Sequence, residues 1–263
     1  MADNNDISTA IAPDLDAGTG ARLARGTNDA PPQWHTWAEI VLASGLPTQF
    51  LILGILVAAG IAPILPDGGL SQVFVIVSLL TDTVLLLGVI IFLLRRRGER
   101  PLEVFFGDRP PLPEITAGIL SFPLVIAVMA GLMLAIRRFI PSLHNVPENP
   151  LERMLGDQLS IWLFLIVVIV AGGVREELQR AFLLHRFRGD LRQPWLGLII
   201  TSLAFGLGHQ LQGLDAAIVT GTLGAIWGAI YLTRRSALAA IVSHSLFNSA
   251  QLIVLLLQST AGG

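Results

Sequence analysis

The sequence predicts an all-α membrane protein, a polytopic bundle of about seven transmembrane helices and possibly eight. Hydrophobic residues make up 53% of the 263 residues, and the mean hydropathy is +0.68. Charged residues make up only 14%, against about 25% in soluble globular domains. Several apolar runs exceed the roughly 20 residues that cross a hydrocarbon core of ~30 Å. The composition therefore argues against a soluble enzyme, and it excludes disorder over most of the length.

The first 35 residues differ from the rest of the chain. They are polar, rich in Asp, Asn, Gly and Pro, and cannot bury enough apolar surface to fold alone. They also lack the charged start and short apolar core of a signal peptide. We therefore expect a disordered tail over 1–35 and a membrane-embedded helical domain over 36–258.

The apolar runs locate the expected spans at 36–64, 72–94, 115–136, 160–185, 195–209, 214–233 and 236–257. The first run is broken by Gly and Pro, which fits an interfacial helix followed by a span. The fifth is short, at about 15 residues, which fits a tilted, buried or partly re-entrant segment that other parts of the protein cover.

Arginine predicts the orientation of these spans. Clusters follow the second, fourth and sixth runs: Arg95 to Arg97 with Arg100, Arg186 with Arg188 and Arg192, and Arg234 with Arg235. Seven spans place all three clusters and the N-terminal tail on one side, which the positive-inside rule makes cytoplasmic. Arg137 and Arg138 fall on the opposite side. We therefore expect a multi-pass protein of a bacterial-type inner membrane with a cytoplasmic N-terminus.

Missing residue types narrow the possible chemistry. All 17 basic residues are Arg, and the chain has neither Lys nor Cys. Schiff-base lysines, thiolate nucleophiles, disulfides and thiolate metal sites are therefore excluded. The net charge of −2 gives no sign of nucleic-acid binding, so we expect no nucleic-acid partner.

Ionisable residues inside apolar spans are costly and are functional candidates by default. Glu176 and Glu177 point about 100° apart on a helix, so they cannot share one role. Glu176 and Arg180 lie four residues apart and can pair on one face. A carboxylate beside Arg in a dry site stays ionised and can deprotonate water. The alternative interpretation is a helix that leaves the bilayer into a charged cytoplasmic collar.

Two histidine motifs follow in the later runs. His209 comes four residues after Phe205, and His244 lies four residues before Asn248 on the last run. Histidine can act as acid, base or metal ligand, and the His244–Asn248 pair suits the stabilisation of an oxyanion. The alternatives are a histidine near the interface and interhelical hydrogen bonding. Asp82, in the middle of the second run, has no charged neighbour in sequence, and we favour a structural acceptor role that needs a distant partner.

In this order, the three motifs resemble the CPBP intramembrane proteases, also called the Abi family, which are related to the type II CAAX prenyl endopeptidase. The resemblance covers roughly residues 115–257. The family's first motif is Glu-Glu-x-x-x-Arg, and the segment from Glu176 to Arg180 has one spacer residue fewer. Aligning Arg180 instead places Arg175 at the family's first Glu and Glu176 at its second, and the run that follows Arg180 favours this register. The other two motifs match without adjustment.

The resemblance implies hydrolysis of a peptide bond in a membrane protein or peptide substrate within the lipid bilayer. Glu176, with Glu177 as second choice, and His209 would activate a water molecule. His244 and Asn248 would stabilise the oxyanion, and Arg180 and Phe205 would support the site. We expect no obligatory cofactor; the alternative is a zinc ion held by Glu176, His209 and His244, although the compact His-Glu-x-x-His pattern is absent.

Two other functions stay open. The altered first motif fits a non-catalytic relative that serves in bacteriocin immunity or binds peptides. A proton-coupled transporter is less favoured because no inverted repeat is visible.

By helical rise, His244 lies roughly 10 Å from Arg235 and His209 roughly 20 Å from Trp195. The two histidines meet only if the fifth run starts late, tilts or is partly re-entrant.

Overall fold

The computed structural model describes residues 33–147 and 158–261. In these ranges the chain is helical, and its one β-type pairing is an isolated bridge between Ile64 and Leu70. The expected tail lies outside the described residues except for Gln33 to His35, which begin the first helix. The all-α prediction is therefore confirmed for the described part of the chain.

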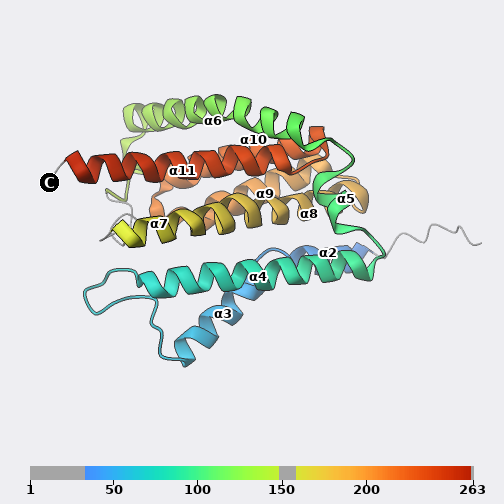
Figure 1. Ribbon diagram of the computed structural model, residues 1–263, viewed down its shortest axis with the longest axis horizontal. Helices are drawn as coiled ribbons and strands as arrows, with labels where there is room; N and C mark the ends of the chain where they lie inside the picture. Colours follow the sequence, from blue (N-terminus) through green and yellow to red (C-terminus); the bar gives the residue numbers. More distant parts are fainter. Residues whose placement is uncertain (1–32, 148–157, 262–263) are drawn as a thin grey trace, which may run out of the picture. The chain divides into compact units, whose positions relative to one another are not determined.

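The helices follow one another along the chain as α2 (Gln33–Leu42), α3 (Leu46–Ala58), α4 (Gln72–Arg96), α5 (Pro101–Phe106), α6 (Pro111–Phe139), η1 (Pro141–Leu143), α7 (Gln158–Val167), η3 (Val168–Arg175), α8 (Glu176–Gly189), α9 (Pro194–Gly208), η4 (Gln210–Gln212), α10 (Leu214–Arg234) and α11 (Leu238–Ala261). Segment η3 has π-helical geometry, and the residues at both of its ends keep right-handed helical backbone angles. Residues 158–189 are thus helical throughout. Figure 1 shows α6 next to α11, with which it is in contact, and α5 at the end where α4 stops and α6 starts.

The expected count of about seven spans is not confirmed. Among the described residues, five helical stretches are long and apolar enough to cross a membrane: Gln33–Ala58, Gln72–Arg96, Pro111–Phe139, Leu214–Arg234 and Leu238–Leu257. Helix α9 is apolar but only 15 residues long, as the sequence indicated for the fifth run. The fourth run is helical at the expected place, but the charged residues of η3 and α8 interrupt its apolar character.

The break in the first run occurs at Gly45, between α2 and α3. Gly45 has φ +89°, in the left-handed region that favours glycine. A Cβ atom there would lie 3.2 Å from Arg175 Nη2. Gln179 on α8 donates from its side-chain amide to the carbonyl of Ala43, at 2.8 Å. The end of α2 is therefore attached to α8, and the helix that carries the two glutamates is held at the break.

The three arginine clusters lie at one end of the bundle, as predicted. Arg97 bonds Glu39 and Asp190, at 2.8 and 2.5 Å, and so joins the first cluster to the end of α8. Arg188 on α8 donates to the carbonyl of Leu232 near the end of α10. This end of the bundle is therefore rich in charge, and its assignment to the cytoplasm remains a prediction. The tail arginines, Arg22 and Arg25, lie outside the described residues.

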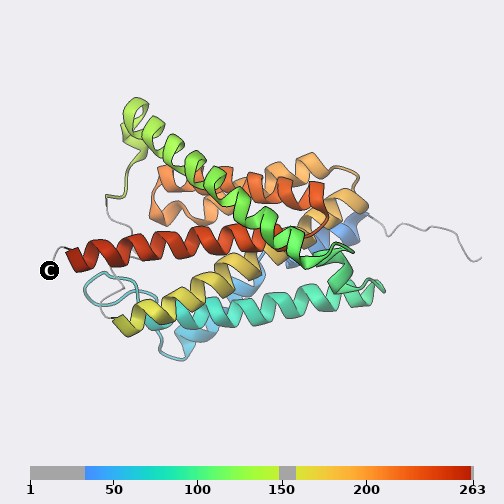
Figure 2. The same cartoon turned by 45° about the horizontal axis from the view of Figure 1, so that its top comes forward.

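Small residues let the later helices approach closely. A Cβ on Gly206 of α9 would lie 2.5 Å from the carbonyl oxygen of Ala217 on α10. A Cβ on Gly118 of α6 would lie 2.6 Å from the carbonyl oxygen of Ala239 on α11. Figure 2 shows α6 crossing α11. Close backbone packing of this kind is typical of membrane helices. It brings the four helices α8, α9, α10 and α11 near enough to share one polar site.

Candidate active site

Glu177 is the buried anionic centre of the candidate site. It is 2% exposed, and its Oε1 accepts a hydrogen bond from Arg180 Nη1, three residues along α8. The same oxygen lies 2.8 Å from Nδ1 of His244 on α11. The expected pair between Glu176 and Arg180 is therefore wrong, because Arg180 turns to the neighbouring carboxylate, which is buried beside it.

Glu176 approaches the same histidine from the other nitrogen. Its Oε2 lies 3.9 Å from His244 Nε2, and its side chain is 21% exposed. The two adjacent carboxylates thus have different surroundings, as their angular separation on a helix requires. One is enclosed with an arginine, and the other keeps access to water beside the histidine.

The ring of His244 is held from three directions. Trp227 of α10 stacks on it, with ring centroids 3.8 Å apart and planes at 14°. Phe205 of α9 meets it edge-on, with centroids 5.9 Å apart and planes at 87°. Since a carboxylate can only accept, the bond to Glu177 makes Nδ1 the donor. Sequence reasoning missed Trp227, because a tryptophan in an apolar run is an ordinary core residue.

Phe205 also packs against Arg180, the other residue for which a supporting role is predicted. The guanidinium carbon of Arg180 lies 4.5 Å from the centroid of the Phe205 ring, a cation–π contact. Gly224 on α10 leaves room for both side chains, because a Cβ there would lie 2.8 Å from the Phe205 ring and 3.3 Å from Arg180 Nη2. The arginine is thus fixed between an aromatic face and a glycine.

His209 lies at the end of α9, one turn beyond Phe205. Its ring packs edge-on against Phe205, with centroids 4.7 Å apart, and Nδ1 donates to the Phe205 carbonyl at 2.8 Å. Among the described contacts, Phe205 touches both histidines and so connects His209 to His244. Helix α9 starts at Pro194, so Phe205, one turn nearer that start, is the residue that reaches the level of His244.

Asn248 and the π-helical segment η3 face each other across the site. Asn248 Nδ2 donates to the carbonyl of Val168, the first residue of η3, at 3.2 Å. A Cβ on Gly172 would lie 2.5 Å from that nitrogen, and one on Gly173 would overlap the hydroxyl of Ser245. The two glycines therefore let α11 approach η3, a role that the sequence did not reveal. π-Helical turns are frequent at functional sites.

Asp82 finds its distant partner in the helical run that also carries Glu176 and Glu177. Its Oδ2 accepts from Arg175 Nη2, and its Oδ1 accepts from the Thr48 hydroxyl at 2.5 Å. Arg175, which aligns with the family's first Glu in one register, is thus paired with a carboxylate on α4 and not with the histidines. The position of a catalytic carboxylate in that register is filled by an arginine that binds a different helix.

The alternative zinc site is not assembled. Among residues 33–147 and 158–261, no group of three or more His, Asp or Glu side chains lies close enough to hold a metal ion. Glu176 and His244 are neighbours, but His209 is turned to the carbonyl of its own helix. The donor set of Glu176, His209 and His244 therefore does not fit a zinc ion in this arrangement.

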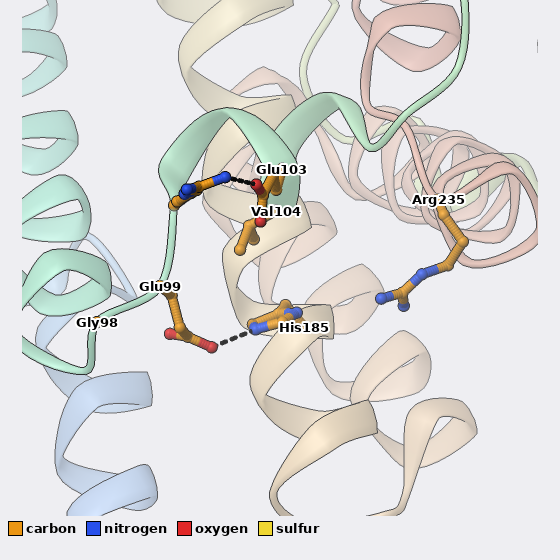
Figure 3. A pocket seen from close by; sticks show the side chains of 7 residues that line it. Gly98, Glu99, Glu103, Val104, His185 and Arg235 are labelled. Carbon is orange, nitrogen blue, oxygen red and sulfur yellow. Dashed lines mark hydrogen bonds and ion pairs between the residues drawn. The ribbon is translucent and has the colours of Figure 1, made fainter.

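A separate pocket of about 310 Å³ lies at the arginine-rich end, lined by Gly98, Glu99, Arg100, Glu103, Val104, His185 and Arg235. Figure 3 shows Glu99 facing His185. Glu99 Oε1 lies 2.7 Å from His185 Nε2. Burial alone would raise the pKa of the Glu99 carboxyl, but the hydrogen bond to His185 and the charge of Arg186 lower that pKa below its ordinary 4.5. The pocket contains none of the predicted site residues.

Comparisons with known proteins agree with the motifs. Residues 157–250 match the family described as type II CAAX prenyl endopeptidase Rce1-like. No curated protein and no solved structure matches the chain. The matched segment contains the three motifs and the four residues described above in contact with His244, namely Glu176, Glu177, Phe205 and Trp227. The resemblance to the CAAX protease family is thereby confirmed for residues 157–250, the part of this membrane protein that carries the whole candidate site.

Proposed function

We propose that the chain is an intramembrane endopeptidase in which Glu176 is the general base. The proposal rests on the different burial of the two carboxylates that lie beside the two ring nitrogens of His244. Glu177 is enclosed and neutralised by Arg180, so it is suited to orient the imidazole. Glu176 is partly exposed and lies 3.9 Å from Nε2, so it is the carboxylate that water can reach. The match to a family of proteases supports the same chemistry.

In the proposed reaction, Glu176 takes a proton from a water molecule held near His244 Nε2. The water oxygen attacks the peptide carbonyl carbon, and the carbonyl oxygen becomes an oxyanion. In its doubly protonated form His244 donates to that oxyanion through Nε2–H, and the free amide hydrogen of Asn248 is a second donor from the same helix. Glu176 then delivers its proton to the leaving nitrogen as the C–N bond breaks. His209 takes no part in this step, because its Nδ1 is bound to the Phe205 carbonyl and Phe205 is the residue that contacts His244.

The test is cleavage of fluorescence-quenched peptides by the purified chain in lipid nanodiscs. The probes are a farnesylated CAAX-type peptide, its unprenylated twin and a peptide with an apolar transmembrane segment. Loss of a general base costs typically 10²- to 10⁴-fold, so we expect Glu176→Gln to lower kcat by at least about 100-fold without loss of thermal stability. Glu177→Gln lowers both activity and stability, because Arg180 stays buried without its partner.

A matched control is Glu103→Gln on α5, whose side chain is 57% exposed and pairs with Arg100 away from the site. This variant should cleave like the parent. If Glu176→Gln, Glu177→Gln and His244→Ala all cleave like the parent, the protease assignment fails.

A second candidate is a non-catalytic member of the family. The observation that favours it is Arg175, which occupies the first-Glu position in one register and is bound to Asp82. This candidate predicts peptide binding without cleavage for all three probes, and binding unchanged by Glu176→Gln. Proton flux into liposomes loaded with a pH-sensitive dye, with neither cleavage nor binding, would favour the transporter instead.

A further inference from the structure

Trp227 is in closer contact with the candidate catalytic histidine than its place in an apolar helix requires. It is completely buried, and its indole plane lies nearly parallel to the His244 ring, at a centroid distance of 3.8 Å. Ordinary aromatic packing in a core favours tilted or offset contacts at larger separations. The other aromatic neighbours of Trp227, Phe205 and Phe247, follow that pattern, at 6.4 and 5.9 Å.

The orientation of the indole is itself fixed by a polar contact. Trp227 Nε1 donates to the hydroxyl of Ser243 at 3.2 Å, and Ser243 is completely buried and adjacent to His244 in sequence. Two adjacent residues of α11 therefore contact Trp227: Ser243 bonds its Nε1, and His244 stacks on its ring. The hydroxyl sets the rotation of the indole, and the indole covers one face of the imidazole.

These contacts leave His244 little freedom. With Nδ1 bonded to Glu177, the ring can still pivot about the line of that hydrogen bond. The stacked indole blocks that pivot on one face of the ring, and the edge-on ring of Phe205 meets the imidazole from the side. With the pivot blocked, Nε2 stays 3.9 Å from Glu176 Oε2. Without the indole, Nε2 could swing away from Glu176 while the bond to Glu177 survived.

We propose that Trp227 is a positioning residue for His244, with Ser243 as the group that sets its rotation. The inference rests on the proposed function for its effect on cleavage, but the positioning itself is independent of any activity. A misplacement of about 1 Å can cost on the order of 100-fold in rate. We therefore expect Trp227→Leu to lower kcat about 10- to 100-fold with little change in KM. Trp227→Phe, which keeps an aromatic face, restores most of the loss.

The structural readout is NMR of the protein with ¹³C-labelled histidine rings, in nanodiscs. A ring proton above an indole face resonates upfield, so the His244 signal, assigned by its loss in His244→Ala, should be shifted upfield in the parent. Trp227→Leu removes the shift, and Ser243→Ala reduces it and lowers kcat to a smaller extent. Trp195→Leu is the control, because Trp195 is 67% exposed on α9 and should change neither the signal nor kcat.

The outcomes separate the two proposals. Loss of the upfield shift together with a fall in kcat supports positioning by Trp227. A His244 signal that is the same in the parent, Trp227→Leu and Ser243→Ala overturns it, and so does an altered signal with an unchanged kcat. If the parent cleaves none of the probes, the proposed function fails, and the His244 signal of Ser243→Ala, which keeps the indole, then decides whether the contact sets the relative orientation of the two rings. Ser243→Ala removes only a hydroxyl and keeps the test valid if Trp227→Leu does not fold.

Discussion

Replacing Asp82 by Asn should strongly destabilise the protein, because it leaves a buried arginine without its counter-charge. Asp82 and Arg175 are 4% and 7% exposed. Asn keeps an oxygen for the Thr48 hydroxyl, so the substitution removes mainly the charge. Breaking a buried ion pair by removing one partner costs about 3–5 kcal/mol. Placing an unpaired arginine at the centre of a membrane helix costs about 2.5–3.5 kcal/mol on insertion scales, which is of the same size.

A loss of this size is a large part of the total of about 5–15 kcal/mol that stabilises a typical protein. It lowers the folding equilibrium constant by a factor of roughly 10² or more, since 1.4 kcal/mol corresponds to a factor of ten. The measurement is unfolding in mixed micelles by increasing SDS, followed by circular dichroism. The comparison includes Arg175→Met and the double variant Asp82→Leu with Arg175→Met. An apolar replacement of the whole pair should be nearly neutral.

The control is Arg100→Gln, because Arg100 and Glu103 form an exposed pair whose contribution to stability is small. If Asp82→Asn unfolds like the parent, the pair is not what holds α4 to the helix with the two glutamates. If the double variant is as unstable as the sum of its single variants, the two residues are not coupled. Either result would refute a structural role for Asp82.

Three further variants test other contacts. Glu99 has a folded pKa below its ordinary 4.5, so its ionised form adds stability that is complete above pH 4.5 and is lost as the pH falls through the lowered folded value; Glu99→Gln should flatten thermal stability against pH in this acidic range. Gly173→Ala should cost about 1–3 kcal/mol by overpacking, and adding Ser245→Gly should recover part of it in SDS unfolding, since the new Cβ meets that side chain. Glu114→Gln should cost about 1.5–3 kcal/mol, because it weakens the two 2.8 Å bonds to Arg234; a thermal midpoint equal to the parent's would contradict the expectation.

Much of the fold followed from the sequence, because apolar runs and arginine clusters report directly on the membrane. The break of the first run, the shortness of α9 and the common end of the arginine clusters all agree with those expectations. The span count did not follow as expected. The run that carries the glutamates contains several charges, and it tolerates them because the charges neutralise one another in pairs, as Arg175 does with Asp82 and Arg180 with Glu177. A rule based on length and composition does not recognise such a helix.

The sequence placed Glu176, Glu177 and His244 in one candidate site, and the structure brings these three together but pairs them differently. A spacing of four residues suggested that Glu176 binds Arg180, but His244, 67 residues further along than Glu177, decides which carboxylate is drawn inward. Trp227 could not be identified from sequence, because only its distance to His244 separates it from a core residue. Asp82 was expected to need a remote partner, and no local pattern pointed to Arg175.

The π-helical geometry of Val168–Arg175 lets the helix take up an extra residue just ahead of the two glutamates. A π turn closes with one residue more than an α turn, so this segment holds extra residues without lengthening the helix in proportion. Removing one residue would let a turn rewind to α geometry and would leave Glu176 and Glu177 aimed much as before, whereas the same deletion in a purely α-helical segment would rotate them by about 100°. The segment thus acts as a winding adjustment, which absorbs a one-residue deletion while both ends of the helix and the two carboxylates stay in place.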